Sequence, residues 1–114
     1  MILNHIALTV SERERAAAFY GRHFGLTERL HDDDHMLVLT AQGCLLTLSE
    51  GVVPPELPRT NHFGFQADSR DAVHEARKGF REAGVPETEW QDENGLVRIQ
   101  VIDPDGYRVE LFAY

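Results

Sequence analysis

The chain has 114 residues, of which 42% are hydrophobic and 26% charged, and its formal net charge is −8. This composition excludes a disordered or collagen-like chain, no apolar run is long enough to span a bilayer, and the acidic balance argues against a nucleic-acid-binding surface. Cys44 is the single cysteine, so an internal disulfide is excluded. Because the amino terminus also reads as a strand rather than a signal peptide, we expect a cytoplasmic protein.

The first half of the chain is predicted to form one strand, one helix and three further strands. Residues 3–10 alternate between apolar and polar side chains behind an Asn4-His5 pair. A helix is predicted from Ser11, where Glu14 completes a capping box, and Gly25 follows as its stop. Three short strands are predicted next, at residues 26–30, 36–41 and 44–49, with a turn at 31–34.

The second half repeats this order. Residues 60–67 again carry an Asn-His pair, Asn61-His62, at the head of an alternating strand. A helix is predicted to begin at Asp68 or Ser69 and to stop at Gly84. Three strands complete the repeat, at residues 87–91, 97–102 and 107–113.

The repeat predicts an α+β fold made of two paired βαβββ modules. The first module is residues 1–50 and the second is 60–114, joined by a proline-rich linker at 51–59. Each module is too small to bury its own sheet face well, so we expect the two to fold together as one domain over 1–114.

The alternation of side chains places three metal-binding residue types away from the predicted helices. His5, His62 and Glu110 fall on the faces opposite the apolar residues of their strands. Two imidazoles and one carboxylate bind a divalent metal and leave coordination positions open for substrate or water. We therefore predict that these three residues hold one divalent ion, with Zn, Ni, Mn, Fe(II) and Co all suited to the set.

The chain also resembles the vicinal oxygen chelate superfamily, which includes glyoxalase I, fosfomycin-resistance transferases, extradiol dioxygenases and bleomycin-resistance proteins. The resemblance rests on Asn4-His5-Ile6-Ala7-Leu8, on Asn61-His62-Phe63-Gly64-Phe65, and on the segment Asp103–Leu111. The resemblance implies that the paired βαβββ modules form a cupped mixed sheet, completed in a homodimer. It also implies a metal held by His5, His62 and Glu110, with Glu110 catalytic.

Two positions depart from family patterns. Thr47 stands at a fourth ligand position, where glyoxalase I carries a carboxylate, so either Thr47 or water fills it. Gln100 stands ten residues before the ligand glutamate, where transferases and dioxygenases commonly carry tyrosine. The residues predicted to bind substrate are Thr47, Arg98, Gln100, Arg108 and Phe112.

Two functions remain open at this point. The first is a metal-dependent enzyme of lyase or isomerase, transferase or dioxygenase type, in which the ion chelates vicinal oxygens of a small substrate and stabilises an oxyanion or enolate. The second is a non-catalytic, drug-sequestering protein of the bleomycin-resistance type, with a cavity lined by Trp90, Phe112 and Tyr114. Both imply a small-molecule partner and neither implies a nucleic acid or a membrane.

Overall fold

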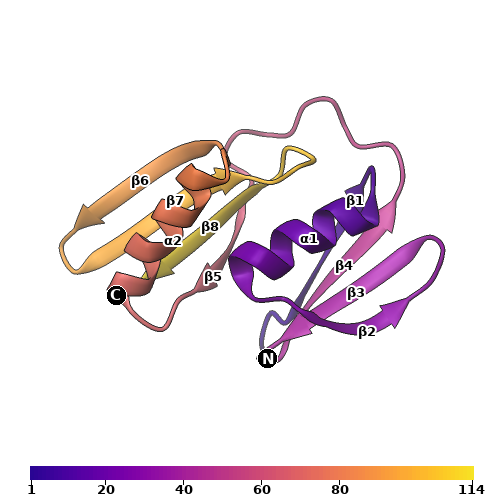
Figure 1. The fold of residues 1–114 in the computed structure, drawn as a ribbon, viewed down its shortest axis with the longest axis horizontal. Helices are drawn as coiled ribbons and strands as arrows, with labels where there is room; N and C mark the ends of the chain where they lie inside the picture. The colour runs from indigo at the N-terminus through magenta and orange to yellow at the C-terminus, as the bar shows by residue number, and fades with distance from the viewer. The chain divides into compact units, whose positions relative to one another are not determined.

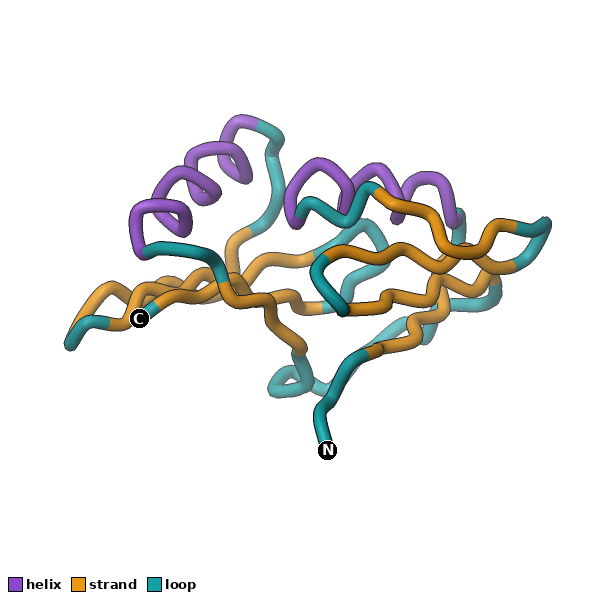
Figure 2. The backbone as a smooth tube through the Cα atoms, turned by 90° about the horizontal axis from the view of Figure 1, so that it is seen from below, coloured by secondary structure: helices purple, strands orange, loops and turns teal.

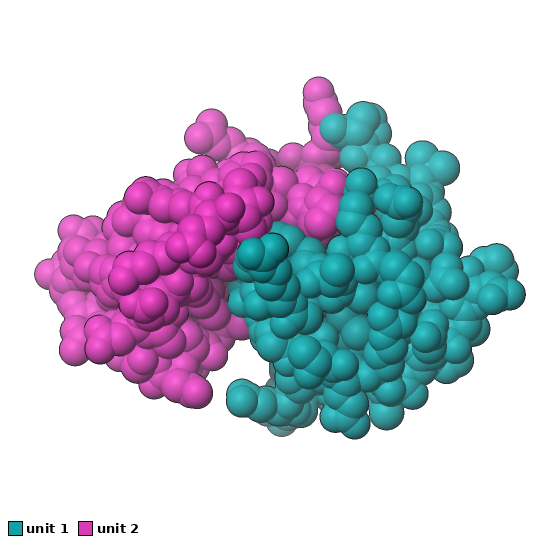
Figure 3. All heavy atoms as spheres, viewed as in Figure 1, with its two compact units in different colours: residues 1–55 teal, residues 56–114 magenta.

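The computed structural model describes residues 1–114, which form two compact units. Unit 1 is Met1–Pro55 and unit 2 is Glu56–Tyr114 (Figure 3). The boundary between them lies inside the segment predicted as the linker, and each unit is described by itself below.

Unit 1 contains one helix and a four-stranded mixed sheet (Figure 1). Its elements are β1 (His5–Val10), α1 (Arg13–Phe24), β2 (Glu28–Asp32), β3 (Met36–Ala41) and β4 (Cys44–Glu50). The strand order is β1-β4-β3-β2, in which β1 and β4 are parallel and the other neighbours antiparallel. The first strand therefore lies beside the last one.

Unit 2 repeats this topology. Its elements are β5 (Phe63–Gln66), α2 (Arg70–Glu82), β6 (Glu87–Glu93), β7 (Leu96–Ile102) and β8 (Arg108–Ala113). The strand order is β5-β8-β7-β6, with β5 and β8 parallel. The predicted α+β class and the two βαβββ modules are thus confirmed, and each module forms its own mixed sheet.

Each helix covers one face of the sheet in its own unit (Figure 2). In unit 1 the fully buried residues include Tyr20 from α1 and Leu46 and Leu48 from β4. In unit 2, Val73 and Phe80 of α2 are buried, as are alternate residues of β7 and β8. The apolar face of each sheet is thereby removed from water, and the opposite face is left to polar side chains.

The capping box predicted at Ser11 is wrong. Helix α1 begins at Arg13 with Glu12 as its N-cap, and the Glu12 side chain makes no capping hydrogen bond. Instead, the Glu50 carboxylate at the end of β4 accepts the backbone N–H of Arg13 at 3.0 Å and its guanidinium at 2.7 Å. These contacts lower the pKa of Glu50. The prediction failed because a residue 37 positions away supplies the acceptor that a local box would supply.

The other helix start follows the sequence prediction. Ser69 is the N-cap of α2, and its hydroxyl accepts the N–H of Ala72 at 3.1 Å. Helix α1 stops at Gly25, whose φ of 72° lies in the left-handed region that glycine adopts without strain. Neither helix has the length and apolar character that crossing a membrane requires.

The predicted turn at residues 31–34 is placed too early. His31 and Asp32 belong to β2, which begins at Glu28 rather than Leu26. The chain reverses at Asp33, whose Oδ1 accepts the N–H groups of His35 and Met36, both at 2.8 Å. A bulge between Arg29 and His31 lies within β2, which continues to Asp32, so only the last two residues of the predicted turn lie outside the strand.

The turn between β7 and β8 is organised by one buried carboxylate. Asp103 is 4% exposed, and its Oδ1 accepts the N–H groups of Asp105 and Tyr107, both at 2.9 Å. The backbone of Asp103 also exchanges a hydrogen bond with Tyr107. This network sets the point at which β8 starts, and hence the position of Arg108.

Replacing Asp103 by Ala should lower the free energy of unfolding by about 2–3 kcal/mol, because two backbone N–H groups lose a charged acceptor. Asp103→Asn retains an oxygen in the same place and should cost about half as much. Urea unfolding of both variants measures the difference. Equal losses in the two variants would show that the carboxylate does not organise this turn.

Candidate functional site

The polar face of the unit 2 sheet is defined by the register of its strands. Residues paired across neighbouring strands point to the same face, and Glu110 in β8 pairs with Gln100 in β7 and with Gly64 in β5. Arg98 pairs with Phe112 in the same way. The structure therefore brings four of the predicted residues, Arg98, Gln100, Glu110 and Phe112, to one face, opposite α2.

An ion pair holds the carboxylate of Glu110 on this face. The Arg98 guanidinium donates to Glu110 Oε1 at 2.7 Å, and the two side chains are 23% and 16% exposed. Arg98 also donates to Glu89 at 3.2 Å and to Gln91 at 3.1 Å. Its charge is thus shared between two carboxylates, while Oε2 of Glu110 has no hydrogen-bond partner.

Gly64 makes room for Glu110. A β-carbon built on Gly64 would lie 3.2 Å from Cβ and 3.3 Å from the backbone oxygen of Glu110, and 3.7 Å from its Oε2. The first two distances are shorter than ordinary van der Waals contact. The absence of a side chain at Gly64 therefore lets β5 approach β8 and keeps the space beside Oε2 open.

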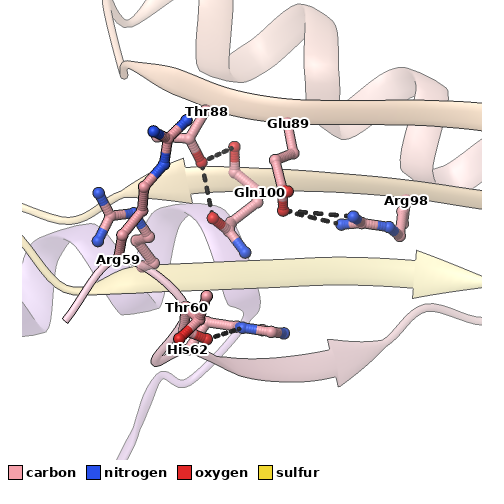
Figure 4. Close-up of a pocket in the computed structure, with 8 residues that line it drawn as sticks. Arg59, Thr60, His62, Thr88, Glu89, Arg98 and Gln100 are labelled. Carbon is pink, nitrogen blue, oxygen red and sulfur yellow. Dashed lines mark hydrogen bonds and ion pairs between the residues drawn. The ribbon is translucent and has the colours of Figure 1, made fainter.

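A pocket of about 500 Å³ opens on unit 2, within the size range of small-molecule sites. Every residue that lines it is of a polar or charged type (Figure 4). The lining residues are Arg59, Thr60, His62, Thr88, Glu89, Arg98, Gln100 and Arg108.

A bulge in β6 aims one of these residues at the pocket. The pairing of β6 with β7 shifts between Glu87 and Glu89, which leaves Thr88 outside the ladder. The Thr88 hydroxyl donates to Oε1 of Gln100 at 2.9 Å and approaches its backbone oxygen at 3.2 Å. Gln100 is 4% exposed, and its amide nitrogen is turned away from Thr88 (Figure 4).

His62 stands just before β5, beside a turn. The N–H of Asn61 donates to the backbone oxygen of Pro58, which closes a turn around Arg59 and Thr60. The His62 Nδ1–H donates to the backbone oxygen of Thr60 at 2.9 Å. Because Nδ1 carries the proton, Nε2 of the neutral ring carries a lone pair.

His5 and Thr47 lie in unit 1. They share the face opposite α1, since β1 and β4 pair His5 with Leu45 and Ala7 with Thr47. The Nδ1 of His5 donates to Oδ1 of Asn4 at 3.0 Å, so its Nε2 also carries a lone pair. Within each unit, no three His, Cys, Asp or Glu side chains lie close enough together to hold a metal ion.

The structure contradicts the aromatic lining expected for a drug-sequestering cavity. The Trp90 ring lies on the helix-facing side of β6, where the Arg77 guanidinium stacks 3.9 Å from its centroid and the His74 ring contacts its edge. Only Phe112 and Tyr114 of the expected trio contact one another, with centroids 5.8 Å apart. The bulge at Thr88 changes the side-chain alternation along β6 and turns Trp90 toward α2, so Trp90 is a packing residue rather than part of a ligand cavity.

Four of the residues that line the pocket were missed by reasoning from the sequence. Thr88 and Glu89 were missed because a bulge is not visible in the hydrophobic pattern. Arg59 and Thr60 lie in the segment treated as a linker, where strand alternation gives no information. The Pro58 that begins their turn was the one available signal.

Comparison with known proteins assigns the family. The model of the Glyoxalase/Bleomycin resistance protein/Dioxygenase superfamily matches residues 2–111. The chain belongs to this superfamily. That assignment confirms the family resemblance noted in the sequence, and members of the superfamily bind small molecules.

Individual members of the superfamily differ in activity. A probable trivalent organoarsenical cleaving enzyme from Bacillus subtilis (strain 168) is 30% identical, over 95% of this chain and 77% of the relative. Among solved structures, Listeria monocytogenes FosX, a fosfomycin resistance protein complexed with Mn(II) and sulfate, has a TM-score of 0.85 at 25% identity, covering 99% of this chain and 91% of that one. Lactoylglutathione lyase from Agrobacterium tumefaciens has a TM-score of 0.78 at 24% identity, covering 98% and 92%.

Replacing Gly64 by Ala should lower the free energy of unfolding by about 1–3 kcal/mol, because the new methyl group meets the backbone of a paired strand. Gly79→Ala in α2 is the matched control. Nothing lies within 4 Å of its β-carbon position, and it should stabilise the protein by about 0.5–1 kcal/mol. Denaturant midpoints of both variants test this, and a Gly64→Ala midpoint at or above wild type would contradict the close approach.

Proposed function

We propose that the protein is a metal-dependent enzyme that acts on a small substrate with two neighbouring oxygen atoms. His5, His62 and Glu110 would hold the divalent ion. When bound, the metal supplies Lewis acidity that stabilises negative charge on substrate oxygens. The observation that carries the proposal is the placement of the two histidine rings, because the Nδ1 of each faces an oxygen, at 3.0 Å in His5 and 2.9 Å in His62, and Nε2 is left as the ring nitrogen that can bind a metal.

The donor set fits a divalent cation. Metal-binding histidines generally donate their second ring nitrogen to an oxygen, which fixes the tautomer and the ring orientation. Thr60 and Asn4 supply those oxygens here. Glu110 Oε2 adds a negative donor atom, while Arg98 holds the other oxygen and orients the carboxylate.

The proposal requires donors from both units, because no unit has three donors by itself. His5 would come from unit 1, and His62 and Glu110 from unit 2, either of the same chain or of its partner in a homodimer. Thr47, on the same face of unit 1 as His5, or a water would complete the ligand set.

The relatives support a divalent metal at the site, but the residues of this chain do not support every relative's reaction. FosX shares the fold and binds Mn(II), which supports an ion of that class at the site. Trivalent arsenic binds thiolates. Cys44, the single cysteine, is half-buried on the helix-facing side of β4, and burial raises the pKa of its thiol. The arsenical-cleaving activity of the Bacillus subtilis relative is therefore not what we propose for this chain.

A drug-sequestering role receives less support. Such a site uses a cavity with aromatic walls, whereas the pocket of unit 2 is lined by polar and charged side chains and Trp90 packs against α2. The donors available at His5, His62 and Glu110 would also have no use there. The enzymatic proposal accounts for both features.

Metal binding by single-residue variants tests the proposal. His62→Ala and His5→Ala should each weaken metal affinity more than the roughly 10- to 100-fold that loss of an outer-sphere partner costs. Glu110→Gln should do the same while keeping an acceptor for Arg98. The measurements are titration with Mn²⁺ and Zn²⁺ and elemental analysis of untagged protein.

His35→Ala is the matched control, since His35 is an exposed histidine of unit 1 outside the proposed set. It should retain wild-type affinity, and circular dichroism should show that every variant is folded. Stoichiometric metal at wild-type affinity in His62→Ala would exclude the proposed site.

A further inference from the structure

The basic side chains of the protein differ in whether they have an acidic partner. The protein has 11 Lys and Arg against 19 Asp and Glu, and most of its basic side chains lie within 4.0 Å of a carboxylate. The basic side chains without a carboxylate partner are Arg22, Arg59, Arg70 and Arg108. In this acidic protein, an arginine without a carboxylate partner is therefore the exception, and no carboxylate in contact with it offsets its charge.

Two of these exceptions line the same pocket. Arg59 and Arg108 both border the 500 Å³ pocket of unit 2, and neither side chain has a hydrogen bond or an ion pair with another protein group. Arg108 is half-buried at the start of β8, and Arg59 is exposed in the turn before β5. Two uncompensated positive charges around one concavity repel each other and create a positive potential that an anion would neutralise.

The other charges at the pocket cancel only part of this potential. Arg98 is paired with both Glu89 and Glu110, so these three side chains together carry one net negative charge, which offsets one of the two unpartnered arginines. One net positive charge remains, and it comes from Arg59 and Arg108, the two arginines without a carboxylate partner.

A buried amide points to a ligand at the same place. The Gln100 residue is only 4% exposed, and its Oε1 accepts a hydrogen bond from the Thr88 hydroxyl. Its Nε2 has no hydrogen-bond partner in the protein and faces the pocket side, away from Thr88 (Figure 4). Although the residue as a whole is buried, this N–H group lies at the pocket wall, so an oxygen of a ligand in the pocket could accept a hydrogen bond from it.

We propose that this pocket binds the anionic group of the substrate, a carboxylate, phosphate or phosphonate, through Arg59, Arg108 and Nε2 of Gln100. Guanidinium groups present several N–H donors to such oxyanions, and the hydrogen bonds are charge-assisted. Thr88 fixes the Gln100 amide so that its donor, rather than its acceptor, faces the ligand. That the anion belongs to the substrate rests on the proposed function. The binding of an anion in this pocket does not by itself require a metal.

The pocket lies beside a proposed metal ligand, so an anion bound there would position a substrate for the metal. His62 lines the pocket and is also one of the proposed metal ligands. An anionic group bound by the two arginines would therefore place the remainder of a small substrate beside Nε2 of His62. We expect the substrate to combine an anionic group with two neighbouring oxygens a short distance away.

Anion binding by metal-free protein tests the proposal. Calorimetric titrations in the presence of a chelator would use methylphosphonate, inorganic phosphate and glycolate, with uncharged propane-1,2-diol as the neutral probe. At least one anion should bind, with affinity that falls as NaCl is raised, and the diol should not. The anion that binds most tightly identifies a tetrahedral or a planar anionic group.

Three variants locate the site. Arg59→Ala and Arg108→Ala should each weaken anion binding about 10- to 100-fold. Gln100→Glu, which keeps the side-chain shape but replaces the donor by a negative charge, should abolish it. Arg70→Ala is the matched control, because Arg70 is an unpartnered exposed arginine of unit 2 outside the pocket, and it should bind as wild type does.

Two results would overturn the inference: wild-type protein that binds none of the three anions, or Arg59→Ala and Arg108→Ala that bind as tightly as Arg70→Ala. The two proposals fail separately. Loss of the anion site with intact metal dependence on His62 would remove only this inference. Anion binding that persists while His62→Ala keeps its metal would remove only the metal-dependent function.

Discussion

The parallel pairing of the first and last strands in each module is the constraint on which the rest of the structure depends. β1 pairs with β4, and β5 pairs with β8, so every module must return its chain to the strand where it began. Parallel neighbours cannot be joined by a tight turn, and the chain crosses over through a helix that covers one face. The opposite face then collects the residues that alternate with the core. In unit 2 this arrangement sets Gly64 against Glu110 and places His62 at the same end of the face.

The same architecture carries different chemistry in the two modules. The face of unit 1 opposite α1 offers mainly hydroxyl and aliphatic side chains, such as Thr9, Thr47 and Val38, together with His5. The corresponding face of unit 2 carries Arg98, Gln100 and Glu110, and the pocket opens there. A repeated fold thus supplies the scaffold twice, while most of the charged groups proposed to act on a substrate belong to the second copy.

Electrostatic pairing divides the arginines of unit 2 into two kinds. Arg98 bridges Glu89 and Glu110 and is satisfied within the protein, so its contribution is to hold Glu110 in place. Arg59 and Arg108 have no such partner and remain available to a ligand. An arginine beside a pocket is therefore not by itself evidence of a binding residue. Its partners decide whether its charge is already neutralised.

The amino-acid sequence by itself determined the class and order of the elements. The repeated Asn-His strands, the apolar stripe of each helix and the glycines after them are local signals, and two βαβββ modules follow from them. Only the tertiary structure decided which side chains meet. Glu50 caps α1 from a distant strand, and the bulge at Thr88 turns Trp90 toward α2 and Thr88 toward Gln100. Arg59 reaches the pocket from a turn without strand periodicity. These contacts depend on register and on long-range approach, and alternation along a single strand carries information about neither.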